Sequence, residues 1–90
     1  MKGRKVSAGM VRRKIREVLN MRPGRGKTED VLLEFVNELC GGGVDVQMLR
    51  DGLEWNLGEA FVRYADKNET ESGEKEWFIT RAGQEHENIT

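Results

Sequence analysis

The lysines and arginines at the start of the chain are the residues with the clearest capacity for chemistry. Residues 1–27 contain ten of them and a single acid, Glu17, whereas the other 63 residues contain five bases and fifteen acids. Lys and Arg side chains neutralise phosphates and release the counterions condensed on nucleic acids. The formal net charge of −1 therefore hides a basic segment of roughly +9 joined to an acidic one of roughly −10. We expect phosphate contacts from Arg12, Arg13, Arg16, Arg22, Arg25 and Lys27, with Arg63 and Lys67 as further candidates.

No set of residues completes a catalytic or metal-binding pattern. A nucleophilic cysteine needs a base, and the only histidine, His86, lies 46 positions after Cys40. His86 also has no second histidine or cysteine at ligand spacing. The segment Gly24–Thr28 ends like a phosphate-binding loop, but Met21 stands where the first glycine is required. The sequence therefore predicts no enzyme activity, no cofactor and no metal.

Composition limits the class of protein further. Ninety residues make one small domain with a modest core. Apolar runs are far shorter than the ~20 residues that span a bilayer, so no membrane contact is expected. The basic start continues into more charge rather than an apolar stretch, which argues against a signal peptide. The lone Cys40 cannot form an internal disulfide and fits a reducing compartment. These features predict a cytoplasmic protein.

A first helix is predicted from a cap at Ser7 to about Asn20. Its apolar residues form one seam within about 100° of arc, and they are Val11, Ile15, Val18 and Leu19. Arg12, Arg13 and Arg16 lie on the other side. Because the Pro-Gly segment 21–27 separates this helix from the rest, the seam needs a partner. We expect either a homodimer through the seam or packing of the seam on the body of the same chain.

Three more helices and one strand are predicted in the acidic part. Thr28 caps a helix that runs to Cys40 and ends at three glycines. Asp45 caps a short helix through Leu53, and Glu54–Asn56 forms a turn. A helix follows over 57–66, with Asn56 as its cap. After a polar loop, Trp77–Thr80 is the strand, and Thr80 caps a last turn. The fold class is thus mainly α with a small β-hairpin.

The order of these elements resembles a winged helix-turn-helix domain. The residues that carry the resemblance are Val46–Phe61, a short helix ending in Leu, a polar turn and a second helix with apolar anchors, and Trp77–Gly83, which resembles the last wing strand. The resemblance covers about residues 28–86. It implies that residues 28–90 are a winged-helix-like domain preceded by a basic tail, helix and linker at 1–27.

In that family the second helix of the pair, here 57–66, would lie in the major groove of DNA, and the wing, here 68–77, would touch the backbone. The outward helix face has two bases, Arg63 and Lys67, against Glu59 and Asp66. The wing has four glutamates and one lysine, a charge that repels DNA.

Two functions follow. The first is a small protein that binds double-stranded DNA, a transcriptional regulator whose basic N-terminal segment supplies phosphate affinity. The second is a protein-interaction module whose acidic body docks a partner or mimics nucleic acid. The two are separated by where the bases cluster in space. If Arg12, Arg13 and Arg16 share a face with Arg63, the first is favoured. If the basic segment points away from the helix pair, the second is favoured.

Overall fold

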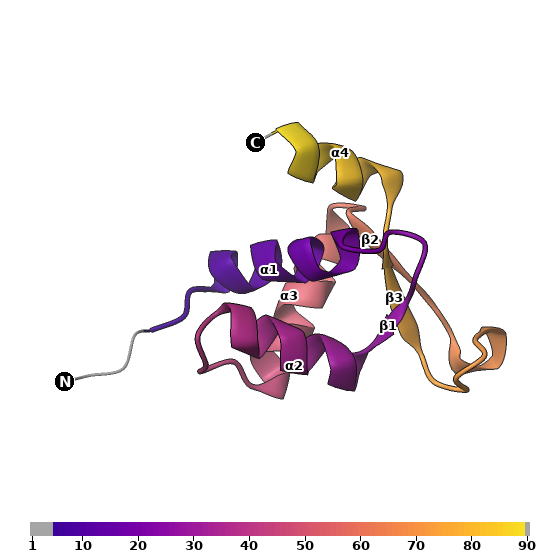
Figure 1. Cartoon of the computed structure of the whole chain (residues 1–90), viewed down its shortest axis with the longest axis horizontal. Coiled ribbons are helices and arrows are strands. Elements are labelled where there is room, and N and C mark those ends of the chain that lie inside the picture. The colour runs from indigo at the N-terminus through magenta and orange to yellow at the C-terminus, as the bar shows by residue number, and fades with distance from the viewer. Residues whose placement is uncertain (1–4, 90) are drawn as a thin grey trace.

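A computed structural model describes residues 5–89 of the protein (Figure 1). In these residues the chain forms α1 (Ala8–Asn20), β1 (Lys27–Thr28), α2 (Glu29–Leu39), α3 (Val46–Gly58), β2 (Val62–Ala65), the 3-10 turn η1 (Lys67–Glu69), β3 (Glu76–Ile79) and α4 (Arg81–Ile89). The three strands make one antiparallel sheet in the order β1-β3-β2. The predicted class, mainly α with a small β-hairpin, is confirmed. The element order is compatible with a winged helix.

Side chains at the helix starts explain several boundaries. The Ser7 hydroxyl accepts a hydrogen bond from the Met10 amide at 3.0 Å, and the Asp45 carboxylate accepts one from the Met48 amide at 2.8 Å. Each cap satisfies a backbone donor that has no partner within its helix. After α2, Gly41, Gly42 and Gly43 all have positive φ, which permits the abrupt turn toward α3. These predicted caps and this predicted end are confirmed.

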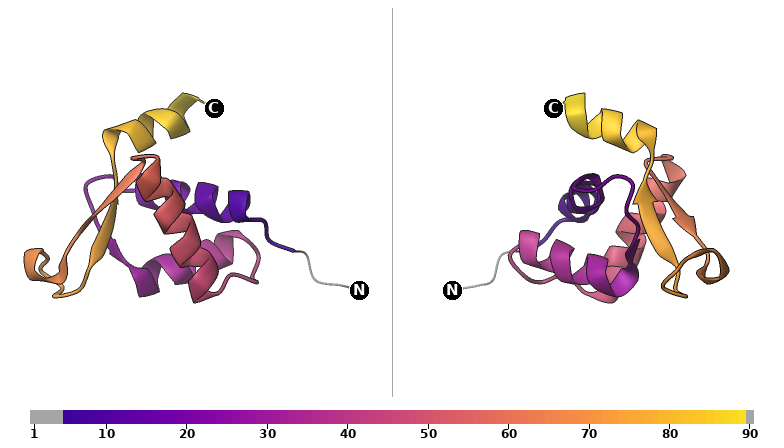
Figure 2. Two further views of the ribbon diagram at one scale, coloured as in Figure 1. Left: turned by 180° about the vertical axis from the view of Figure 1, so that it is seen from behind. Right: turned by 45° about the vertical axis from the view of Figure 1, so that its right-hand side comes forward.

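α1 lies at the centre of the molecule, with α2 on one side and α4 on the other (Figures 1 and 2). It contacts α3, α2, α4 and β3. The four seam residues of α1 are at most 1% exposed, and they pack in one cluster with residues of α2, α3, β2 and β3. Gly52 of α3 permits this close packing, because a methyl group there would lie 2.8 Å from the Ile15 side chain.

The prediction of a homodimer through Val11, Ile15, Val18 and Leu19 is therefore wrong. All four side chains are covered by the chain itself, as the alternative expectation had it. A second copy could reach them only if the core opened, which would expose the apolar surface that stabilises the fold.

None of the helices in residues 5–89 has the length and apolar character that a membrane-spanning helix needs.

The prediction of a turn at Glu54–Asn56 and a helix over 57–66 is also wrong. α3 runs through the predicted turn without interruption to Gly58, and residues 62–65 form strand β2. Asn56 does not cap a helix. Its side chain is fully buried and donates to the carbonyl oxygens of Gly52 and Arg12. The chain reverses at Ala60, which has a φ of 63°.

The turn at Ala60 is tied to the start of α4. The Thr80 hydroxyl donates to the Ala60 carbonyl at 2.7 Å and accepts from the Gly83 amide at 3.0 Å. Thr80 thus caps α4, as predicted, and also holds the end of α3 against the end of β3. Gly83 packs on the Phe61 carbonyl, and no side chain would fit between them.

Candidate interaction surfaces

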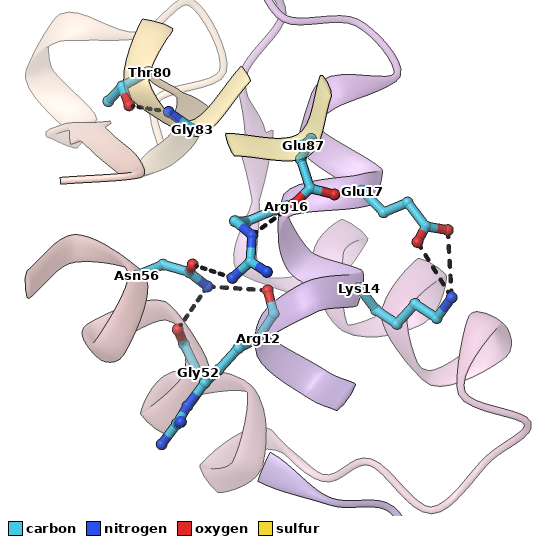
Figure 3. A network of polar contacts seen from close by, with 9 residues as sticks. All are labelled: Arg12, Lys14, Arg16, Glu17, Gly52, Asn56, Thr80, Gly83 and Glu87. Atoms are coloured by element: carbon cyan, nitrogen blue, oxygen red, sulfur yellow. Dashed lines mark hydrogen bonds and ion pairs between the residues drawn. The ribbon is translucent and has the colours of Figure 1, made fainter. Parts of the chain in front are cut away.

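Arg16 and Arg12, two of the predicted phosphate contacts, make side-chain contacts within the protein, and Figure 3 shows the hydrogen bonds of Arg16. Arg16 is 7% exposed, and its guanidinium donates to Glu87 of α4 at 2.7 Å and to Asn56 of α3 at 3.0 Å. Arg12 lies over the Trp55 ring, with its guanidinium carbon 4.6 Å from the ring centroid. Arg16 therefore joins three helices and does not point to solvent.

The other predicted site residues are spread over several surfaces. Arg13 is exposed on α1, and Arg22 and Arg25 are exposed in the loop between α1 and β1. These three arginines form no ion pair within residues 5–89. The remaining three predicted residues are Lys27 over the Phe35 ring, Arg63 on β2 over the Phe78 ring, and Lys67, exposed in η1.

Arg12 and Arg16 do not share a face with Arg63. Arg12 and Arg16 pack toward α3 and α4, whereas Arg63 extends from the sheet beside Phe78. The condition that favours family-style DNA binding is therefore not met.

The exposed side of α3 is acidic. Its solvent-facing charged residues are Arg50, Asp51 and Glu54. The Arg50 guanidinium donates two hydrogen bonds to the Glu29 carboxylate, at 2.8 and 3.0 Å. Such a two-point contact neutralises the only base among these three residues. The hydrogen bond from Arg50 also holds the pKa of the Glu29 carboxyl below its usual value, with a smaller contribution from the Lys75 charge.

Between α3 and the β2–β3 loop (residues 66–75) lies a hollow of about 520 Å³, which we call the acidic groove. It is lined by Glu29, Asp30, Arg50, Glu54, Glu74, Lys75 and Trp77. Four carboxylates thus face two cations. The Lys75 ammonium lies 4.0 Å from the Tyr64 ring centroid and 4.8 Å from that of Trp77. The groove therefore combines net negative charge with aromatic surface that already holds one ammonium group.

A second hollow, of about 610 Å³, separates the α1–β1 loop from the β2–β3 loop on the other side of the sheet. Arg22, Arg25 and Lys27 line one wall, and Glu69, Glu71 and Glu76 line the other. Because bases and acids face each other here, part of the positive charge of the basic segment is offset by the loop. This arrangement weakens the surface as a phosphate site.

Sequence reasoning missed the acidic groove. The sequence predicts Glu29 in a helix, Glu54 in a turn and Glu74 in a loop, and nothing in their spacing indicates that they meet. One signal was present: the fifteen acids after residue 27 were too many for a surface that binds phosphate.

Comparison with protein-family models, with characterised proteins and with solved structures gave no match to this chain. The class is therefore defined by the fold alone: a small, mainly helical domain with a three-stranded antiparallel sheet.

Proposed function

We propose that this protein is a winged-helix interaction module that binds a positively charged partner protein through the acidic groove. In this arrangement α2 and α3 are the helix pair and the β2–β3 loop is the wing. The single observation that carries the proposal is that the surface between α3 and the wing is lined by four carboxylates and two cations.

The charge of that surface argues against DNA as its ligand. A helix that enters the major groove needs bases or neutral donors facing the phosphates and base edges. Here Arg50 is already bound to Glu29, and Asp51 and Glu54 are exposed beside it. Carboxylates at these places repel phosphate, whereas they steer a basic protein toward the groove.

The test is binding of a labelled, flexible lysine-rich peptide, measured by fluorescence anisotropy over a series of salt concentrations. We expect binding that weakens as salt rises, because exposed charge pairs are screened. Glu54→Gln with Glu74→Gln removes two of the four carboxylates and should weaken binding about tenfold. Glu85→Gln is the matched control, since this exposed carboxylate lies on α4 in an ion pair with Arg81. Absence of peptide binding at low salt contradicts the proposal, as does an equal effect of the control.

Nucleic acid binding through the basic segment remains a second candidate. The observation that favours it is the exposure of Arg13, Arg22 and Arg25 without ion pairs in the described part of the chain. The test is a salt titration with random duplex DNA. Replacement of the three arginines by Gln should lower the log-log salt slope by about 0.9 for each lost phosphate contact. Absence of affinity at low salt eliminates this candidate.

A further inference from the structure

α2 carries an apolar stripe that the fold leaves uncovered. Val31, Phe35 and Leu39 are 38%, 39% and 40% exposed. They are spaced four residues apart and therefore lie along one side of the helix. The core side of α2 is formed by other residues, among them Leu32 and Val36, which are fully buried. The stripe is thus additional to the surface that α2 needs for folding.

Acidic side chains border the stripe. Asp30, Glu34 and Glu38 are exposed and, at 100° per residue, lie together on the side of the stripe that faces away from the core. Lys27 precedes α2 in the chain, and its ammonium lies 5.6 Å from the ring centroid of Phe35, the middle residue of the stripe. The surface therefore presents an apolar row with a negative border on one side.

The stripe is continuous with the acidic groove. Asp30 lines the groove, and Val31, the next residue, begins the stripe. From Val31 to Leu39 the stripe extends about 12 Å at 1.5 Å per residue, which matches two to three turns of a helix laid along it. One partner segment can therefore reach both surfaces.

We infer that α2 docks a short amphipathic helix of a partner protein, with apolar residues at i, i+4 and i+7 or i+8 facing the stripe and Lys or Arg along the flank that meets Glu34 and Glu38. The inference rests on the proposed function, because it names the form in which the basic partner binds. Helices that present apolar anchors to such a surface use this spacing.

The borders of the stripe explain why the occupant is not a second copy of the chain. A symmetric contact places the same patch of both copies together. In an antiparallel contact of two α2 helices, Glu34 and Glu38 of one copy would approach the acidic flank of the other, and like charges at a contact oppose binding. A basic helix meets the same border with opposite charge.

The probe is a synthetic helical peptide with leucines on one face and lysines on the flank. Its control is a peptide of the same composition with the leucines distributed around the helix. We expect the patterned peptide to bind more tightly. Phe35→Ala or Leu39→Ala should weaken binding of the patterned peptide about tenfold, as truncation of a central apolar contact does. Leu57→Ala is the matched control, because Leu57 is 37% exposed on α3, outside the stripe. Thermal melting verifies that each variant is folded.

The outcomes separate the docking of a helix on α2 from the proposed function of the acidic groove. Equal binding of the two peptides, or unchanged binding by Phe35→Ala, overturns the docking of a helix on α2. If the flexible lysine-rich peptide still binds, and its binding still requires Glu54 and Glu74, the proposed function stands although the docking of a helix on α2 does not. Sedimentation that shows a wild-type dimer and a Phe35→Ala monomer assigns the stripe to a second copy and also overturns the inference.

Discussion

At the scale of single residues, Asn56 joins the parts of the protein most directly. Its amide nitrogen donates to the carbonyl oxygens of Arg12 and Gly52 at 3.2 and 2.9 Å, and its oxygen accepts from Arg16 at 3.0 Å. These contacts use both amide hydrogens and the amide oxygen of a side chain that is fully buried. The network fixes how α1 lies against α3, and Figure 3 shows it at their crossing.

Asn56→Ala should lower the free energy of unfolding by about 2–4 kcal/mol, because it leaves a buried guanidinium and a carbonyl oxygen with fewer partners. Urea denaturation followed by circular dichroism measures the change. Gln47→Ala is the control: Gln47 is exposed on the same helix and bonds only Asp51 in the described chain. It should change stability by less than about 0.5 kcal/mol. Equal effects of the two substitutions would contradict the role of Asn56.

The pair of Glu29 with Arg50 predicts a pH dependence. Because the pKa of Glu29 is lowered in the folded state, its contribution to stability is present above the unfolded value of about 4.3 and is lost as pH falls through the folded value. Arg50→Gln should raise the pKa of Glu29 toward its ordinary value and make the acid loss of stability shallower. A carbon-detected NMR titration of Glu29 in both proteins measures the shift, and identical titration curves would contradict the assignment.

At the scale of elements, the sequence predicted α1 and α2 well because both have a regular apolar period. Ser7 caps α1 as predicted, whereas the Thr28 side chain makes no cap hydrogen bond at the start of α2. It failed at the end of α3, where local signals misled. Asn56 followed by Glu59 resembles a helix start, and only the distant Arg16 shows that the amide is needed inside a helix. β1 is two residues long and has no period to detect. The sequence places Arg16 on the side of α1 away from the seam. α4, which covers Arg16 in the structure, was predicted only as a last turn after Thr80.

α4 is joined to the body by the Arg16–Glu87 ion pair and by the stacking of His86 on Phe61, with ring centroids 4.5 Å apart. Glu87→Gln should weaken this attachment, because it removes the charge that faces a nearly buried guanidinium. Faster hydrogen exchange of the α4 amides, with α1 and α3 less affected, is the expected result. Glu85→Gln, on the exposed side of α4, should leave exchange unchanged. Equal protection of α4 in both variants would contradict the prediction.

The junction of β3 with α4 makes a separate demand on Gly83. Gly83→Ala would place a methyl group against the Phe61 carbonyl and 2.8 Å from the Ile79 side chain, so we expect a loss of about 1–3 kcal/mol in stability. Gly58→Ala is its control, since nothing lies within 4 Å of the added methyl group in α3. That substitution should leave stability unchanged or raise it by about 0.4–1 kcal/mol. Thermal melting distinguishes the two, and a neutral Gly83→Ala would show that the junction adapts.

At the scale of the whole molecule, the charge division read from the sequence does not separate the protein into an arm and a body. α1 carries much of the positive charge, yet its apolar seam forms the centre of the core and Arg16 forms its polar crossing with α3 and α4. Four of the acids, by contrast, gather from α2, α3 and the β2–β3 loop into one groove. The charge pattern in the sequence left two kinds of partner open, and the three-dimensional arrangement shows which charged residues share a surface.

This arrangement makes the division at residue 27 testable. The four seam residues of α1 are buried, and burial of each aliphatic side chain contributes about 1.5–3 kcal/mol, or about 6–12 kcal/mol together. Domains are commonly stable by about 5–15 kcal/mol, so a fragment of residues 28–90 should not fold alone. A proton–nitrogen NMR spectrum should show it collapsed to narrow amide dispersion, and a synthetic peptide of residues 5–27 should restore the dispersed spectrum. Ile15→Ser in that peptide should abolish the rescue, whereas Arg13→Ser, on the exposed side of α1, should preserve it. A well-dispersed spectrum from residues 28–90 alone would contradict the prediction, because it would mean that these residues fold without α1.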